Sequence, residues 1–498
     1  MRKTTLWAGG LLLAFWAGGC MVGPNFKRPA APQVKGYTAA PLNPTVATPN
    51  IAGGQSQHFV KGLDIPGQWW TLFHSKPLNA LIERSLANNP DVEAAQAALT
   101  VAHEDVLAQR GVFFPTLTGS LPIQRSKTPN LFSPFVTTST AKGFTYYSLY
   151  TPQVAVSYMP DVWGLNRRTA ESLQAQEQGA RFAAEATYIT LSANVANAAI
   201  QEASLRAQIA ATQQIIKINS DLLEIIRFQF EKGAASQVDV AAQEAQLAQI
   251  NALLPPLRKQ LAQVRDLLAV LAGEFPSEGM AEQFELASLQ LPQELPVSLP
   301  SKLVEHRPDV LQAEANLHAA SAQIGIAVAN RLPNLTLTAD AGSIATAAAK
   351  MFSSGTGFGD LALNLAEPLF DGGTLLHQER AARAAYVQAA QQYRSTVLAA
   401  FQNVADSLNA LEEDADALKA AAAAEQAAHA SLDLSEQQLK YGLIAYSALL
   451  SAQQTYQQAL VNLVQARANR FADTVALFQS LGGGWWNRPE AGSNTNEH

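Results

Sequence analysis

The sequence repeats itself at long range, and this internal similarity limits the chain to an architecture that is built twice. Four segment pairs match in the same order: NNPDVEAAQAAL at 88–99 with HRPDVLQAEANL at 306–317, FFPTLTGS at 113–120 with RLPNLTLT at 331–338, DVWGL at 161–165 with FDGGT at 370–374, and EKGAASQVDV at 231–240 with KYGLIAYSAL at 440–449. The first two pairs are offset by 218 residues and the last two by 209. A constant offset that changes once indicates two homologous halves. Their main length difference is a loop, nine residues longer in the first half, between about 121 and 160.

Each half is predicted to run as helix, two strands, long helix, turn and helix. Residues 166–231 contain no proline and a single glycine, Gly179, which predicts a helix of about 65 residues and roughly 100 Å. The other expected helices are 78–111, 236–272 with a break or kink at Pro255–Pro256, 373–440 and 444–481. Because 78–111 and 236–272 together about equal the long helix, they are expected to lie end to end beside it. Helix length alone also fits a coiled-coil spacer.

The alternation of apolar and polar residues predicts two strands in each half. They are placed at 115–123, about 144–160, 333–342 and 359–369, and strands of about 9 to 11 residues can cross a bilayer when tilted. Aromatic residues gather near their ends, as in outer-membrane barrels: Phe113, Phe114, Tyr146, Tyr147, Tyr150, Tyr158, Trp163, Phe358 and Phe370. A soluble sandwich core is the alternative. The segments 124–143 and 343–357 are expected to be exposed loops.

Four strands cannot close a membrane barrel alone, since the smallest single-chain barrels have eight. An open sheet edge in lipid would leave backbone groups without hydrogen bonds. A membrane-spanning sheet therefore requires several chains, and the strand pattern does not choose among two, three and four.

The N-terminus has the layout of a secretory signal in residues 1–19. Two basic residues precede an apolar run at 6–16, and Ala17-Gly18-Gly19 lead to Cys20, the only cysteine. The apolar run is too short to span a membrane, and one cysteine excludes an intrachain disulfide. The small residues before Cys20 resemble the lipobox of bacterial lipoproteins, although Ala17 replaces the usual Leu. Cleavage would then leave Cys20 as a first residue carrying N-acyl (palmitate) and S-diacylglycerol lipid; a simple cleaved signal with a spare thiol is the alternative.

The composition argues against several other functions. Without residues 1–19 the formal net charge is −9, whereas a nucleic-acid partner calls for a basic stripe. The eight histidines never form a pair at i, i+3 or i+4, so a metal site is not expected. Nucleophile-elbow and phosphate-loop motifs are absent. We therefore expect no enzyme activity and no cofactor beyond the lipid.

Three segments resemble the outer-membrane factor (TolC-like) family, in its lipoprotein branch of resistance-nodulation-division efflux channels. These are GCMVGPNFKRP at 19–29, WWTLF at 69–73 and YGLIAYSALLSAQQTYQQALVNLVQARANRFADTVALFQSLGGGW at 441–485. The resemblance covers essentially the whole mature chain. It implies a mixed fold in a homotrimer: a long α-helical periplasmic tunnel continuous with a 12-stranded β-barrel, to which each chain gives four strands.

On this basis the chain divides into six segments. They are the signal peptide 1–19, a lipidated and equatorial segment 20–76, the first repeat 77–274, an equatorial linker 275–300, the second repeat 301–481 and a tail 482–498.

The resemblance implies passive export across the outer membrane of a Gram-negative bacterium. An inner-membrane resistance-nodulation-division pump and a periplasmic adaptor would deliver drugs or other small toxic compounds to the channel. A type I secretion duct, a metal-ion efflux duct and a lipid-anchored periplasmic spacer are the alternatives. Met21, where an Asp would resemble an inner-membrane retention signal, favours the outer membrane.

The resemblance also places a gate at the two helix turns, 232–236 and 441–446. Asp239 matches a position where the family often pairs neighbouring helices, although a first-turn carboxylate is also favoured by the helix dipole alone. Ser451, Ser447 and Ile444 stand where relatives carry a constricting Asp, an apolar gating residue and an Arg partner. The closed state is therefore expected to use other contacts, with Lys232 and Lys440 as candidates.

Overall fold

The computed structural model describes residues 21–132 and 142–488; the predicted signal peptide and Cys20 lie outside this range. The chain divides into two compact units. The strand unit comprises Met1–Arg28, Thr100–Gly179 and Glu314–Gln392, and the helical unit comprises Pro29–Leu99, Ala180–Ala313 and Tyr393–His498.

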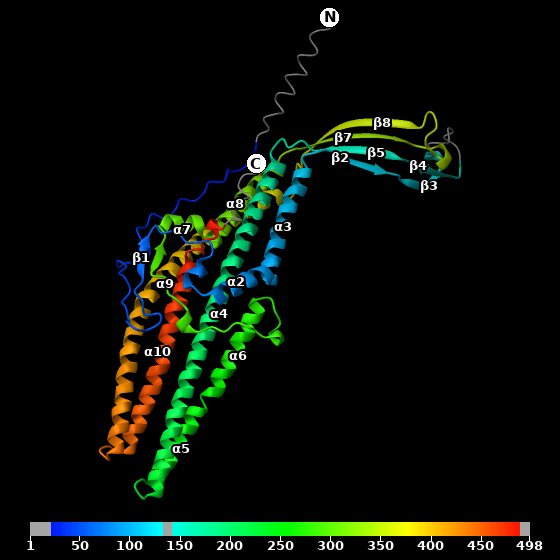
Figure 1. Cartoon of the computed structure of the whole chain (residues 1–498). Coiled ribbons are helices and arrows are strands. Elements are labelled where there is room, and N and C mark those ends of the chain that lie inside the picture. The colour runs from blue at the N-terminus through cyan, green and yellow to red at the C-terminus, as the bar shows by residue number, and fades with distance from the viewer. Residues whose placement is uncertain (1–20, 133–141, 489–498) are drawn as a thin grey trace. The chain divides into compact units, whose positions relative to one another are not determined.

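Two very long helices dominate the chain, as the proline-free stretches predict. Helix α4 (Leu165–Glu231) and helix α9 (Thr374–Lys440) each contain 67 residues. Helix α4 turns into α5 (Gln237–Asn251), and α9 turns into α10 (Tyr446–Ser480) (Figure 1). The predicted break in the first pair is confirmed, because α6 (Leu254–Leu271) begins anew with its prolines in the first turn, where a missing N–H costs no helical hydrogen bond.

The helix predicted at 78–111 is wrong, because the structure has two helices there. Helix α2 (Lys76–Asn88) ends at Asn89, whose φ of −75° and ψ of 125° are extended, and α3 (Pro90–Gly111) follows. A residue before proline is driven out of the helical region by the proline ring. The second half breaks in the same way at Arg307 (φ −76°, ψ 121°), between α7 (Pro300–His306) and α8 (Pro308–Ala329).

The two breaks are capped by equivalent long-range hydrogen bonds. Asn89 Nδ2 donates to the carbonyl of Leu271, the last residue of α6, at 3.0 Å. Arg307 Nη1 donates to the carbonyl of Ser480, the last residue of α10, also at 3.0 Å. The donors are separated by 218 residues and the acceptors by 209, the two offsets of the sequence repeat.

A left-handed glycine closes each of these junctions. Gly273 has a φ of 76°, and a Cβ there would lie 2.4 Å from the carbonyl oxygen of Asn88. Gly482, 209 residues later, has a φ of 96°, and its Cβ would lie 3.2 Å from the carbonyl oxygen of His306. Only glycine adopts this backbone without cost and leaves room for the carbonyl. Each break is therefore a built joint between helix ends.

The shorter helices lie along α4, as their lengths predict. In the strand unit, His103 Nδ1 of α3 lies 2.7 Å from Glu177 Oε1 of α4. In the helical unit, Arg265 Nη1 of α6 donates to Glu202 Oε1 of α4 at 2.7 Å.

The core of the helical unit is built on the WWTLF segment. This segment forms a 3₁₀ turn (Trp69–Phe73), and both tryptophans are fully buried. The Trp69 ring stacks on Phe478 of α10 with the ring centroids 5.5 Å apart. A short parallel pair, β1 (His58–Lys61) with β6 (Glu294–Val297), lies in the same unit.

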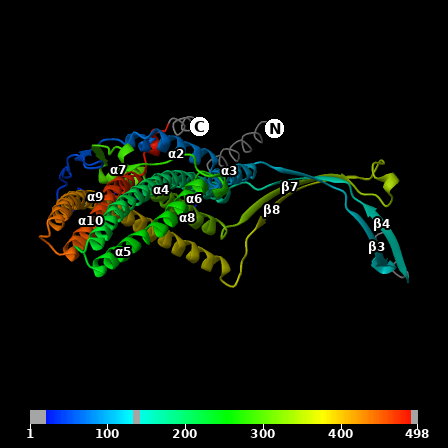
Figure 2. The ribbon, with the colours of Figure 1, turned by 60° about the horizontal axis from the view of Figure 1, so that its bottom comes forward.

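The strand unit contains a four-stranded antiparallel sheet in the order β2-β5-β7-β8 (Figure 1). Figure 2 shows its strands β7 and β8 from another direction. Its strands are β2 (Thr116–Ser120), β5 (Gln153–Tyr158), β7 (Asn334–Ser343) and β8 (Gly357–Ala366). β7 and β8 have 10 residues each, and the loop predicted between them is confirmed.

The first hairpin is longer than predicted. The segment 124–143 is not all loop, because β3 (Ile123–Pro129) pairs with β4 (Phe144–Tyr150) in a two-stranded sheet of its own. Pro122 and Pro152 separate these strands from β2 and β5, since proline has no N–H for a sheet hydrogen bond. Thr151 N still donates to Pro122 O at 3.0 Å.

Candidate functional site

The four-stranded sheet has one apolar and one polar face. Its register places Leu117 opposite Val156, and it places Leu337 opposite Leu363. Three leucines of β8, Leu361, Leu363 and Leu365, are 77%, 64% and 67% exposed on the apolar face. A row of exposed leucines is unusual for a surface that faces water.

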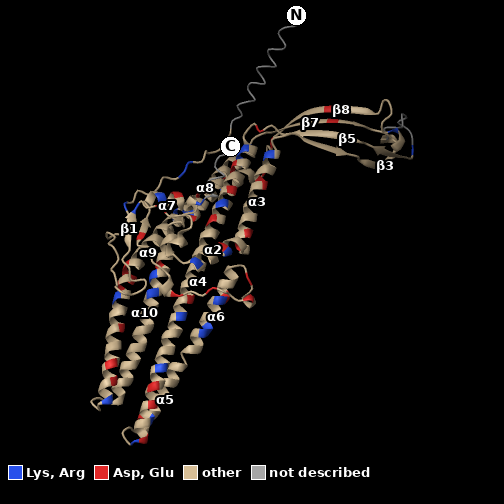
Figure 3. Cartoon of the chain, viewed as in Figure 1, with Lys and Arg blue, Asp and Glu red and all other residues tan. Residues whose placement is uncertain are grey.

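The opposite face carries hydroxyl, amide and carboxylate side chains. It includes Thr336, Thr338 and Asn364, and Asp340 lies directly opposite Asp360. Two like charges across a strand pair repel each other, so this face requires water. Figure 3 shows that charged residues are spread along the helices and are sparse on the strands. The sheet thus has an apolar side suited to lipid and a polar side suited to a water-filled lumen.

Among the described residues, the outer strands β2 and β8 of this sheet are each paired on one side only, so each has a free edge in the single chain. Their outward backbone N–H and C=O groups can pair with another strand. Among the residues that the structure describes, no helix is long and apolar enough to cross a membrane.

The two helix turns at 232–236 and 441–446 are both built on left-handed glycines. Gly233 has a φ of 74° and Gly442 a φ of 69°. After Gly233, Ala234 N donates to Gln229 O at 2.8 Å, and after Gly442, Leu443 N donates to Gln438 O at 2.9 Å. These bonds satisfy the last carbonyls of the two long helices.

The predicted gate residue Asp239 forms a helix cap within its own chain. Its Oδ2 accepts hydrogen bonds from Ser236 N at 2.9 Å and Ser236 Oγ at 2.7 Å, while Asp239 N donates to Ser236 Oγ at 3.2 Å. This reciprocal arrangement is a capping box that starts α5. The carboxylate of Asp239 therefore has a defined role in the first turn of its own helix, which is the alternative to a gate role.

The structure does not join the other predicted gate residues to Asp239. Lys232, the residue after the end of α4, is exposed, and its Nζ lies 5.3 Å from the centroid of the Phe228 ring. Lys440, Ser447 and Ser451 are also exposed. Within the described part of the chain, no hydrogen bond or ion pair connects any two of these predicted residues.

A different set of residues holds the two helical hairpins together, and no sequence motif predicts it. Tyr446 Oη donates to Gln243 Oε1, which joins α10 to α5. Gln243 Nε2 in turn donates to Asn219 O at 2.8 Å, which joins α5 to α4. Burial, and then the charge of Asp239, raise the pKa of Tyr446. This phenol therefore stays protonated and keeps its donor role at physiological pH.

An apolar cluster supports these polar links. It joins α4, α9 and α10, and its buried members are Leu222, Ile226, Ala428, Leu432, Leu449, Ala452, Tyr456 and Ala459. The turns are therefore the ends of a packed four-helix arrangement within one chain.

A half-buried carboxylate, that of Asp473, lies on α10 in the helical unit. Burial and the neighbouring carboxylate of Asp414 raise the pKa of Asp473 to about 8, against the opposing charge of Arg470. The Arg470 guanidinium is itself buried and donates to Leu411 O at 2.7 Å and to Gln55 O at 3.2 Å. Its hydrogen bonds thus go largely to carbonyls, which leaves Asp473 without a full counter-charge.

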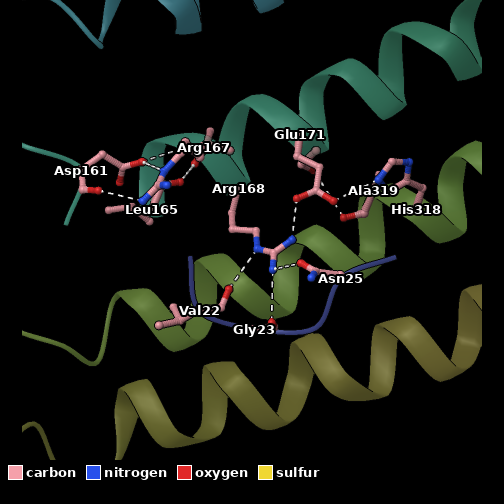
Figure 4. A network of polar contacts seen from close by, with 12 residues as sticks. Val22, Gly23, Asn25, Asp161, Leu165, Arg167, Arg168, Glu171, His318 and Ala319 are labelled. Carbon is pink, nitrogen blue, oxygen red and sulfur yellow. Dashed lines mark hydrogen bonds and ion pairs between the residues drawn. The ribbon is translucent and has the colours of Figure 1, made fainter. Parts of the chain in front are cut away.

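In the strand unit, Arg168 of α4 binds the start of the described chain (Figure 4). Arg168 Nε donates to Val22 O at 2.9 Å, and Nη2 donates to Gly23 O at 3.1 Å and to Asn25 Oδ1 at 2.9 Å. The Arg168 side chain is 0% exposed, and Nη1 pairs with Glu171 at 2.6 Å. The residues that follow Cys20 are therefore fixed on α4; Cys20 itself lies outside the described residues.

The sequence profile of the family described as outer membrane efflux protein matches residues 81–274 and 299–483. These segments make up more than half of the 498-residue chain. The chain belongs to the outer membrane efflux protein family.

Individual members of the family are similar over nearly the full length. The chain is 30% identical over 462 residues to the pyoverdine export outer membrane protein OpmQ of Pseudomonas aeruginosa, which covers 90% of this chain and 94% of OpmQ. It is 28% identical over 474 residues to the probable efflux pump outer membrane protein TtgC of Pseudomonas putida, which covers 95% of this chain and 94% of TtgC.

Solved structures share the fold. The Campylobacter jejuni CmeC outer membrane channel superposes with a TM-score of 0.81 at 18% identity, covering 93% of this chain and 95% of that one. The outer membrane protein VceC of Vibrio cholerae gives a TM-score of 0.77 at 25% identity, covering 84% of this chain and 100% of that one.

These comparisons confirm the predicted family, the outer-membrane location and the role as the outer-membrane channel of an efflux pump. As a member of the outer membrane efflux protein family, the chain is a transport protein and not an enzyme.

Proposed function

We propose that three copies of this chain form one passive exit duct, in which twelve strands make a barrel and the helices make a periplasmic tunnel. The sheet carries this proposal: it has two free edges, β2 and β8, and an exposed leucine face. Free edges in lipid would leave backbone groups unsatisfied. Pairing β8 of one copy with β2 of the next removes every edge once the ring closes.

Such a ring is a head-to-tail assembly, in which each copy uses two different surfaces. The two unlike edges, β2 and β8, support this type of contact, and the number three comes from the outer-membrane factor family. The Asp340–Asp360 face would then line the water-filled lumen, where repulsion between the two carboxylates is screened.

The equivalent joints at Asn89 and Arg307 support an origin of the two halves by duplication. The two matches of one family profile, 81–274 and 299–483, support it too.

The proposed partners are a periplasmic adaptor, an inner-membrane resistance-nodulation-division pump and outer-membrane lipid. The proposed cargo is small organic compounds that are toxic or secreted. Relatives carry names that refer to pyoverdine export, antibiotic efflux and toluene efflux, a range that fits a duct with little selectivity of its own.

Two finer parts belong to the same proposal. Cys20 carries the lipid and serves as an address and secondary tether, and the tip closes through Asp239 with Lys232, Lys440, Ser447 and Ser451 nearby. The capping box leaves Asp239 only partly buried, so its carboxylate can meet a neighbouring copy.

The test is assembly and conductance of the purified full-length protein. We expect trimers that resist heating in detergent and that conduct ions in planar bilayers. A chain that is a soluble monomer after deletion of residues 1–20 would contradict the proposal and favour a periplasmic spacer.

A further inference from the structure

An apolar groove of about 440 Å³ lies in the strand unit, where strand ends meet helix ends. Its wall comes from the β5–α4 connection, the α8–β7 turn and the end of β8. Apolar residues of this wall include Trp163, Leu165, Leu332, Leu335 and Pro368. Asp161 and Glu367 also line it. The Asp161 carboxylate already accepts from Asn166 N and Arg167 N, each at 3.0 Å, and is not a free charge facing the groove.

The first described residues pack on the segment 163–165, whose Trp163 and Leu165 line one wall of this groove. Gly164 stands between Trp163 and Leu165, and a Cβ on it would lie 2.7 Å from Met21 Cγ. Val22 N donates to Trp163 O at 3.0 Å. Cys20 is one peptide bond from Met21, a Cα–Cα step of about 3.8 Å. A group attached to the Cys20 sulfur or amine therefore starts near the groove.

Specific contacts hold Val22 and Gly23 in place, whereas a flexible linker to a lipid would need no such contacts. Arg168 binds the carbonyls of Val22 and Gly23 from a fully buried position. Gly23, with a φ of 87°, packs so closely on α8 that a Cβ would lie 2.4 Å from Gly325 Cα. The chain is thus held in place from Met21 onward, one residue after the proposed lipid attachment point.

We propose that one acyl chain of the lipid on Cys20 lies in this groove, against the protein, and does not extend freely into the membrane. The proposal rests on the proposed lipidation of Cys20. A hydrocarbon chain gains from leaving water and covers the exposed apolar wall. The occupant is the acyl chain attached to Cys20, the residue directly before Met21. The contacts of Arg168 with Val22 and Gly23 set the point from which this acyl chain starts. The lipid would thereby fix the depth of the strand ends in the membrane.

The test uses a palmitate analogue with a diazirine near its methyl end, supplied during growth and incorporated into the protein's own lipid. The full-length protein is purified in detergent and irradiated, and its peptides are mapped by mass spectrometry. We expect adducts on 159–165 or 329–335. Adducts only on phospholipid, or only on segments away from the groove, would overturn the proposal, as would adducts that join two copies.

The intact mass of the protein before irradiation distinguishes the lipidation of Cys20 from the placement of the acyl chain in the groove. An unlipidated Cys20 in processed protein would refute the lipidation proposal itself. A lipidated Cys20 without groove adducts would refute the groove assignment alone.

A matched pair of variants tests the groove directly. Leu335 and Leu337 lie on the same face of β7, and only Leu335 lines the groove. We expect Leu335→Trp to reduce groove adducts at least fivefold because its indole fills the space, and Leu337→Trp to leave them unchanged. Equal adduct yields in the two variants would overturn the assignment; if Leu335→Trp does not assemble, the adduct map of the unaltered protein still decides.

Discussion

At the scale of single residues, two fully buried arginines, Arg168 and Arg470, have a different role from the charged residues on the surface. Arg168 donates hydrogen bonds to the backbone carbonyls of Val22 and Gly23, which lie 146 and 145 residues earlier in the chain. Arg470 likewise binds Gln55 O across 415 residues. Each ties a terminal segment without regular structure to a long helix.

Replacing Arg168 should therefore cost far more stability than replacing an exposed arginine. Arg168→Ala leaves several buried acceptors unpaired, and we expect a loss of about 3 kcal/mol. Arg227→Ala is the control, because its pair with Glu244 at 2.6 Å has side chains 56% and 48% exposed, and such pairs contribute less than about 1 kcal/mol. Chemical unfolding of the detergent-solubilised protein measures both; equal losses would contradict the clamp.

Asp473 should make stability depend on pH. Its pKa is about 8 in the folded chain and about 3.9 when unfolded, so the folded state holds a proton that the unfolded state releases. Stability should then fall as the pH rises from about 4 to about 8. Asp473→Asn should flatten this part of the thermal unfolding profile. Asp416→Asn, at an exposed position of α9, should keep the original slope; identical slopes in all three proteins would show that Asp473 is not the group.

At the scale of elements, the two helix turns of the repeat differ in how their helix ends are stabilised, a difference that the periodicity of the sequence does not predict. The first tip turn has a capping box at Ser236, whereas the equivalent residue of the second turn, Ala445, has no side-chain cap. The second hairpin is held instead by Tyr446 and the apolar cluster. The two turns of the repeat are thus stabilised by different means.

Two substitutions in the first turn separate a cap from a gate. Ser236→Ala and Asp239→Ala should each weaken the start of α5 by about 1 kcal/mol, visible as faster amide exchange at 236–240. Only Asp239→Ala removes the charge, so we expect it alone to raise single-channel conductance. A rise in both variants would assign the effect to a loosened cap, and no rise in either would exclude a gate role for Asp239.

At the scale of the whole molecule, the proposed barrel and the lipid are two independent attachments to the membrane. The free edges of β2 and β8 require other copies, whereas the Arg168 clamp acts within one chain. The assembled sheet would hold the protein in the bilayer even without an acyl chain.

Cys20→Ser should therefore impair processing or sorting more than conduction. We expect less mature protein in the outer membrane, together with normal conductance per inserted trimer in planar bilayers. The unaltered protein at matched trimer number is the control. A variant that inserts but conducts nothing would refute a secondary role for the lipid.

The sequence alone was sufficient for features that repeat along the chain. The absence of proline predicted α4 and α9, the two-residue alternation predicted β7 and β8, and the offsets of 218 and 209 predicted the order of elements. These are local properties, because hydrogen bonds within a helix and side-chain alternation in a strand depend on neighbouring residues. Pro90 is a local signal too, because a proline drives the residue before it out of the helical region, and the helix predicted across it is wrong for that reason.

Only the tertiary structure decided which distant residues meet. The partners of Arg168, the link from Tyr446 to Gln243, the joints at Asn89 and Arg307, and the pairing of β3 with β4 depend on how helices and strands pack. A side chain such as Asn89 looks the same in sequence whether it faces water or caps a helix 182 residues away. The role of Asn89 depends on its burial and on its distance from the end of α6, and a local sequence pattern predicts neither.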